Sequence, residues 1–262
     1  MHNMRNSLEI ILTLGIMDLK LKYRSSKLGF LWSFLKPLLQ FVVYYIVFAV
    51  FLQVGKGSDY PLMLFLGVLI WGFFTEGTSL GMNSYLGKKA IVTKINVSKI
   101  LMPVAAYVTP ALNFLLNFLI FFTLYVCFSF HNLSNLSPVG VGLLLLMFLD
   151  IGVIIVALNV ILANLNAIFR DVQNIWELIL QYGVFMTPII YPLPVPDQYL
   201  VPYFFTNVLA FPIELIKKQF FVYETKIMDP YIIIAHIVSL LILCAVAAMV
   251  HRKISDKVAD YL

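Results

Sequence analysis

The chain has 262 residues, of which 61% are hydrophobic and 12% are charged, and its mean hydropathy is +0.94. A soluble domain carries about 25% charged residues, so this composition excludes a water-soluble globular protein and favours an integral membrane protein. The net charge is +5, but the basic residues gather in a few short segments, which is typical of membrane topology signals rather than of a nucleic-acid surface. Cys127 and Cys244 both lie in apolar runs, so neither a disulfide framework nor a metal site is indicated.

The N-terminal segment predicts an amphipathic helix that lies in the cytoplasmic interface of the membrane. Over residues 4–24, apolar side chains recur at helical spacing and the charged side chains lie largely off that stripe. The apolar stretch 10–17 runs into the sequence DLKLKYR and not into a small-residue cleavage site. We therefore do not expect a secretory signal.

Six stretches are long enough to cross a bilayer, which takes about 20 apolar residues per helix. The run from Ile100 to Leu149 contains no Asp, Glu, Lys or Arg, and the turn-forming sequence HNLSNLSPVG divides it into two spans. One membrane domain, residues 1–262, accounts for the chain. The expected transmembrane helices cover residues 29–52, 60–86, 101–130, 140–165, 172–191 and 231–250.

The distribution of basic residues predicts which ends of the spans face the cytoplasm. If the N-terminus is inside, the Lys and Arg residues that fall outside are only Lys56, Lys217, Lys218 and Lys226, of 18 in the chain. The positive-inside rule therefore predicts cytoplasmic N- and C-termini. The expected fold is an all-α integral membrane protein with six transmembrane helices.

Two connecting segments carry further expectations. Residues 88–99, with the sequence KKAIVTKINVSK, form a short basic cytoplasmic segment between the second and third spans. Residues 193–229 should face outside, yet they are rich in apolar and aromatic residues and are broken by prolines. Because such a segment is too apolar for a free loop, we expect short extracytoplasmic helices that re-enter the outer leaflet before the last span.

Two sequence motifs are typical of other activities. GTSLG, residues 77–81, matches the nucleophile-elbow pattern, and an intramembrane hydrolase would use Ser79 with His236 as its base. A small-xxx-small packing face formed by Gly77 and Gly81 is the favoured interpretation. GMNSYLGKK, residues 81–89, has the wrong spacing for a phosphate-binding P-loop and follows no strand, so we do not expect ATP to bind this chain.

Three acidic residues, Glu76, Asp150 and Glu177, lie inside predicted spans. Each would cost about 2.5–3.5 kcal/mol at a lipid-facing helix centre, so each should face protein or water. An ion-coupled secondary transporter that uses these three acids is the alternative function.

Aromatic residues make up 15% of the chain and are frequent in the first and fifth spans. One interpretation is lipid-facing bulk with interfacial aromatic belts. The other is a path on which sugar rings slide, because an amphipathic ring offers an apolar face without strong directional bonds. On the second interpretation, the candidate path residues are Phe41, Tyr44, Tyr45, Phe48, Trp176, Tyr182 and Phe185.

Two segments resemble the ABC type-2 exporter permeases that move polysaccharides such as O-antigen, capsule and teichoic acid across bacterial inner membranes. They are DLKLKYRSSKLGFLWSFLKPLL, residues 18–39, and FRDVQNIWELILQYGVFMTPIIYPLPVPDQY, residues 169–199. The resemblance runs in register over nearly the whole chain. TNVLAFPIELIKK, residues 206–218, departs from the family pattern, in which an Asn-Pro precedes a basic residue.

The resemblance implies a homodimer joined to two copies of a separate nucleotide-binding ATPase subunit, which binds ATP and Mg. This chain would then be neither an enzyme nor a cofactor-binding protein. Residues 88–99 would include the helix that couples to the ATPase, although positive-inside topology explains this basic segment equally well. The coupling residues would be Lys88, Lys89, Lys94, Asn96 and Lys99.

The implied substrate is a glycan or polyol-phosphate polymer on an undecaprenyl diphosphate lipid in the bacterial inner membrane, with no nucleic-acid partner. Basic residues near the first span would attract anionic headgroups, at about 1 kcal/mol each near the surface. They would also guide the lipid diphosphate towards the dimer. These residues are Lys20, Lys22, Arg24 and Lys27.

Overall fold

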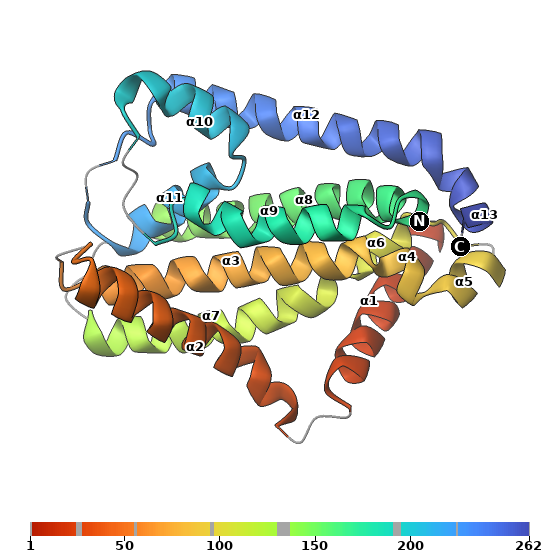
Figure 1. The fold of residues 1–262 in the computed structure, drawn as a ribbon, viewed down its shortest axis with the longest axis horizontal. Helices are drawn as coiled ribbons and strands as arrows, with labels where there is room; N and C mark the ends of the chain where they lie inside the picture. The colour runs from red at the N-terminus through yellow and green to blue at the C-terminus, as the bar shows by residue number, and fades with distance from the viewer. Residues whose placement is uncertain are drawn as a thin grey trace.

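The structure is a computed structural model that describes residues 2–24, 28–54, 57–94, 97–129, 137–190, 195–223 and 225–261. Within these ranges the regular secondary structure is helical, without a strand, which confirms the expected all-α class (Figure 1). The longest helices run alongside one another and form a bundle. Shorter helices gather at its two ends.

The centre of the bundle is α3, Tyr60–Met82, which is apolar on all sides. A helix of this kind is stable only where neighbours cover it, and most of α3 is buried. It packs on α7, Val108–Phe128, and α8, Pro138–Ile168, and touches α2, Trp32–Tyr44, and α9, Val172–Met186.

The Gly77 and Gly81 pair lies where α3 meets α8. A Cβ atom added at Gly77 would lie 2.8 Å from Ile155, and one added at Gly81 would lie 1.9 Å from Asn159. Neither position has room for a side chain, so the two glycines set the close approach of the helices. This contact confirms the packing interpretation of GTSLG.

In the described part of the chain, five helical stretches are long and apolar enough to cross a membrane, at residues 32–51, 60–82, 101–128, 138–168 and 230–254. The first combines α2 with the π-helical turn Tyr45–Phe51, and the last is α12, Pro230–Ile254. The third is interrupted at residues 106–107 between α6, Leu101–Ala105, and α7. The protein is therefore a multi-pass membrane protein.

The fifth expected span, 172–191, is shorter in the structure. Its helix α9 has 15 residues and ends at Met186, and residues 191–194 lie outside the described part of the chain. At 1.5 Å per residue α9 is about 22 Å long, less than the roughly 30 Å of a hydrocarbon core. A sixth candidate span comes instead from α10, Leu200–Thr206, with the preceding turn, and α11, Ala210–Phe220, which meet at 112°.

The bent pair α10 and α11 lies in the region where short extracytoplasmic helices are expected. The corner between them is held by Asn207, whose Nδ2 donates to the Met186 carbonyl and the Thr187 hydroxyl, both at 3.1 Å. On α11, the buried Lys217 donates to the Pro188 carbonyl and lies 3.9 Å from the buried carboxylate of Glu214. These polar contacts tie α11 to the end of α9. Insertion of this pair into the outer leaflet stays a prediction.

The two chain termini lie at one end of the bundle, and α10 and α11 lie at the other (Figure 1). The helix α1, His2–Tyr23, starts at the terminal end and runs obliquely away from the bundle. It touches α7 closely at Gly15, whose carbonyl accepts from Thr109 Oγ1 at 3.0 Å. Apolar side chains of α1, such as Leu8 and Leu12, are exposed. Its position in the membrane interface and the cytoplasmic location of the termini stay predictions.

Candidate functional site

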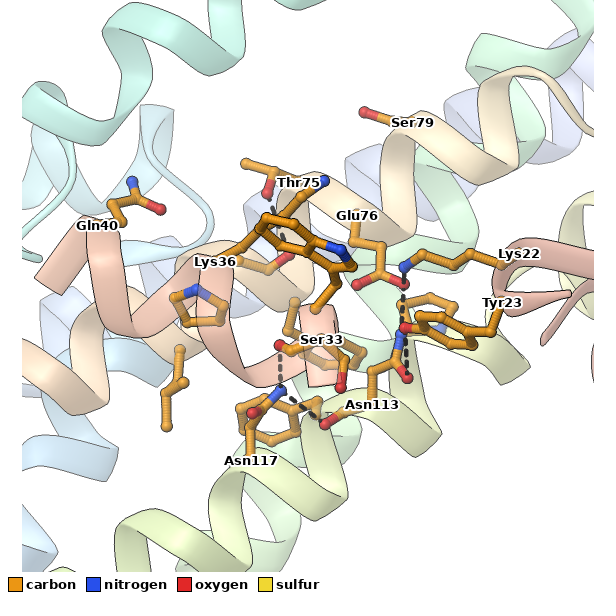
Figure 2. A pocket seen from close by; sticks show the side chains of 17 residues that line it. Lys22, Tyr23, Ser33, Lys36, Gln40, Thr75, Glu76, Ser79, Asn113 and Asn117 are labelled. Atoms are coloured by element: carbon orange, nitrogen blue, oxygen red, sulfur yellow. Dashed lines mark hydrogen bonds and ion pairs between the residues drawn. The ribbon is translucent and has the colours of Figure 1, made fainter. Parts of the chain in front are cut away.

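A polar pocket lies between α1, α2, α3 and α7, with a cavity volume of about 360 Å³ (Figure 2). This volume lies within the range of roughly 300–1,000 Å³ that is typical of small-ligand sites. The pocket combines two lysines and one glutamate with several amide and hydroxyl groups. Its charged and polar lining residues are Lys22, Tyr23, Trp32, Ser33, Lys36, Gln40, Thr75, Glu76, Ser79, Asn113 and Asn117.

Glu76 is the hub of the hydrogen bonds in this pocket. Its Oε1 accepts from Lys22 Nζ and from Asn113 Nδ2, each at 2.7 Å. The Asn113 Oδ1 in turn accepts from the Tyr23 hydroxyl at 3.3 Å. In Figure 2 the side chains of Lys22 and Tyr23 enter from α1 and meet Glu76 and Asn113, which come from α3 and α7. The network therefore joins the oblique helix α1 to the bundle.

On the α2 side, Asn117 links α7 to the start of α2. Its Nδ2 donates to the carbonyls of Ser33 at 3.1 Å and Asn113 at 2.9 Å. The pocket residues Lys36 and Trp32 are exposed. The sequence alone assigns no functional role to Lys36 or Trp32. A lysine that is followed by a long apolar run nevertheless indicates a polar surface inside the membrane.

The four basic residues that are expected to contact lipid headgroups differ in their exposure and in their ion pairing. Lys20 and Arg24 are exposed near the end of α1, whereas Lys22 is paired with Glu76. Lys27 lies outside the described residues. The structure therefore brings one member of this basic set into the pocket.

The seven aromatic residues expected along a path divide into three groups. Phe41, Tyr44, Tyr45 and Phe48 are partly buried on α2 and the adjoining turn, where they pack against the hydrophobic core. Tyr182 and Phe185 on α9 are 59% and 45% exposed. Trp176 is 9% exposed, and its Nε1 donates to Thr78 Oγ1 at 3.1 Å.

The helices that carry these aromatic residues, α2 and α9, both touch α3. In the single chain the exposed aromatic side chains of this set are Tyr182 and Phe185 of α9, whereas those of α2 and the adjoining turn are partly buried. Trp176 of α9 is buried, because it faces α3.

The basic segment 88–99 includes the short helix α5, Lys89–Lys94. Lys88 Nζ contacts Asp18 of α1 at 2.6 Å, and Lys99 Nζ donates to the Ser255 carbonyl at 2.8 Å. Lys89 and Lys94 are exposed, and Asn96 lies outside the described residues. Two of the five expected coupling residues are therefore engaged within the chain, and two are accessible.

The three acidic residues on which the alternative, an ion-coupled transporter, would depend each have a different partner in this chain. Glu76 is bound by Lys22, Asp150 is 3.0 Å from His236 Nε2, and Glu177 accepts from Gln173 Nε2 at 3.0 Å. Among the described residues, no group of His, Cys, Asp and Glu is arranged to hold a metal ion. Ser79 lines the polar pocket while His236 lies against Asp150 and Phe211, so the described geometry offers no Ser–His pair.

An all-helical bundle with several candidate spans and a polar pocket between its helices defines a multi-pass membrane protein rather than a soluble binding protein. Over 188 residues the chain is 32% identical to the O-antigen export system permease protein RfbA of Myxococcus xanthus, which covers 70% of this chain and 68% of that protein. Over 192 residues it is 26% identical to RfbA proteins of Klebsiella pneumoniae, covering 72% of this chain and 71% of theirs.

No family model matches the chain. The relationship to RfbA nevertheless shows the family: the chain belongs to the O-antigen export permeases, which are ABC type-2 polysaccharide-export permeases. It is a transport subunit and not an enzyme.

Proposed function

We propose that this chain is the membrane subunit of an exporter that moves an undecaprenyl-diphosphate-linked polysaccharide outward across the bacterial inner membrane. O-antigen, capsule and teichoic-acid-like polymers are the candidate cargo. ATP hydrolysis in a separate nucleotide-binding subunit drives the step. The observation that carries the proposal is the 32% identity to an O-antigen export permease over most of both chains.

The functional unit is a homodimer of this chain with two ATPase subunits on its cytoplasmic face. The exposed α5 is the docking element, since Lys89 and Lys94 are accessible at the same end of the bundle as the chain termini. Lys88 and Lys99 act differently, because Lys88, next to α5, contacts Asp18 of α1, and Lys99, beyond α5, donates to the Ser255 carbonyl.

The polymer passes along the accessible faces of α2 and α9 at the centre of the dimer. Tyr182 and Phe185 have large exposed ring surfaces, which suit weak contacts with successive sugar rings. Trp176 fixes α9 to α3 through Thr78 instead of touching the polymer.

The test is to express the tagged chain in its host, purify it in mild detergent and identify the co-purifying proteins by mass spectrometry. A P-loop ATPase at about one copy per copy of this chain is expected, and deletion of the gene should leave lipid-linked glycan inside the cell. If the chain is stable alone and its transport follows an ion gradient, the proposal is wrong.

A further inference from the structure

We propose that the groove between α8 and α12 binds one anionic phospholipid, with the headgroup at Arg252 and an acyl chain along the groove. The two helices pack against each other, and the groove beside their contact has a cavity volume of about 590 Å³. The lipid is a resident of the complex and not its cargo. The inference therefore goes beyond the proposed export function and does not depend on it.

Small side chains open this groove between two long helices. Its floor is formed by Ala157, Val160 and Ala247, which are buried together in one hydrophobic cluster. On the α12 side Ala248 also lines the groove and adds little bulk. The lining residues of α8 begin at Leu149 and end at Val160, a distance of about 16 Å at 1.5 Å per residue. A long recess with an almost entirely apolar lining suits a hydrocarbon chain.

The charge at one end of the groove favours an anion. Arg252 lines the groove in the last turn of α12, where it is exposed, and none of the described lining residues is Asp or Glu. A guanidinium group can hold a phosphate through two parallel N–H···O bonds. Basic pockets between transmembrane helices are typical sites for anionic phospholipid headgroups. A headgroup at Arg252 places an acyl chain in the apolar recess, so both parts of the groove match one phospholipid.

A basic residue at the end of a span also fits the positive-inside rule, which requires no bound lipid. The neighbouring Lys253 separates the two explanations, because it is exposed in the same turn of α12 but does not line the groove. A topology signal, or a general attraction to anionic lipids, depends on both charges alike. A site in the groove depends on Arg252.

The experiment measures lipid binding to the full-length complex, purified in detergent, by native mass spectrometry. The probes are dioleoyl phosphatidylglycerol and dioleoyl phosphatidylethanolamine, which share their acyl chains and differ in net charge. Phosphatidylglycerol should bind in preference. Arg252→Gln should weaken its binding about fivefold, because one charged contact is lost. Arg252→Lys should keep most of the binding, and the matched control Lys253→Gln should change it by less than about twofold.

A second pair of variants tests the groove without a change of charge. Ala248→Phe should fill the groove and displace the lipid, whereas Ala245→Phe is the control, because Ala245 is exposed on the same helix but does not line the groove. Cys244 provides an independent readout, since it lines the groove while Cys127, the other cysteine, is exposed on α7. Phosphatidylglycerol should slow the reaction of N-ethylmaleimide with Cys244 more than phosphatidylethanolamine does, and Cys127 should react equally in both lipids.

Equal binding of the two lipids overturns the proposal. Equal effects of Arg252→Gln and Lys253→Gln overturn it as well, because the basic end of α12 would then act only as a topology signal. Normal phosphatidylglycerol binding by a folded Ala248→Phe chain would place the lipid outside the groove. If Cys244 is already shielded in the lipid-free complex, another protein chain covers the groove and the proposal is wrong. Surface polysaccharide after deletion of the gene tests the export function separately.

Discussion

At the scale of single residues, polar side chains in the membrane part of this protein are held by partners far away in sequence. Lys22 and Glu76 are 54 positions apart, and Asp150 and His236 are 86 apart. A charge inside a bilayer is expensive, so each of these groups lies against an opposite charge or a hydrogen-bonding group.

The ion pair between Lys22 and Glu76 should stabilise the docking of α1. Its side chains are 35% and 26% exposed, so solvent screens the pair and its coupling energy should be about 0.5–1 kcal/mol. A double-mutant cycle with Lys22→Met and Glu76→Gln, read from unfolding in detergent, measures this coupling. Strictly additive effects would mean that the pair contributes nothing to stability.

Gly81→Ala should destabilise the contact of α3 with α8. The added Cβ would lie 1.9 Å from the Asn159 side chain, and overpacking of this kind costs about 1–3 kcal/mol. Gly72→Ala is the matched control on the same helix, because a Cβ there meets nothing within 4 Å. Melting temperatures of the two variants in one detergent provide the comparison. Equal melting temperatures would contradict the packing assignment.

At the scale of elements, local signals set where the long helices α8 and α12 begin, whereas tertiary contacts set the position of the short helix α5. Ser137 and Asp229 cap α8 and α12 by accepting backbone N–H groups at 3.0 and 2.9 Å, and each is followed by a proline at the first helical position. These signals are local, so they define where the spans begin. The position of α5 depends instead on tertiary contacts, made by Lys88 with Asp18 of α1 and by the buried Val92 with a hydrophobic cluster.

Charge reversal of α5 should weaken the docking of the ATPase subunit. Lys89→Glu with Lys94→Glu changes two accessible charges and should lower affinity for the ATPase about tenfold or more, without unfolding the chain. Pull-down of the ATPase and the melting temperature report on the two effects. Lys218→Glu, on α11 at the other end of the bundle, is the control. Normal ATPase recovery with the double variant would exclude docking through these lysines.

At the scale of the whole molecule, α3 is buried, whereas α2 exposes mainly aliphatic side chains and α9 exposes Tyr182 and Phe185. In the proposed homodimer, the exposed side chains of α9 would line the polymer path. Phe41 packs edge-on against Phe65 of α3, with ring centroids 5.2 Å apart, so part of the aromatic content of α2 is structural.

Tyr45→Ala with Tyr182→Ala should impair export and leave the assembly intact. Loss of two ring surfaces removes weak contacts with the polymer, so surface polysaccharide should fall several-fold while size-exclusion profiles stay unchanged. Trp176→Phe is an informative comparison, because loss of its bond to Thr78 should lower stability more than transport. Unchanged surface polysaccharide in the double variant would remove both tyrosines from the path.

The sequence by itself determined the membrane class, the positions of most spans and the packing role of Gly77 and Gly81. These features depend on composition, on runs of apolar residues and on four-residue spacing, which are all local. It also pointed to the family through residues 18–39 and 169–199, in agreement with the relatives found.

Only the tertiary structure decided which polar residues meet. The sequence placed Lys22 among headgroup contacts and Glu76 among ion-coupling acids, yet the fold pairs them and builds a pocket around them with Asn113 and Lys36. Likewise Trp176 is buried, and α9 ends at Met186. Such pairings follow from how helices cross in space, and a pattern of local hydrophobicity does not specify which helix faces which neighbour.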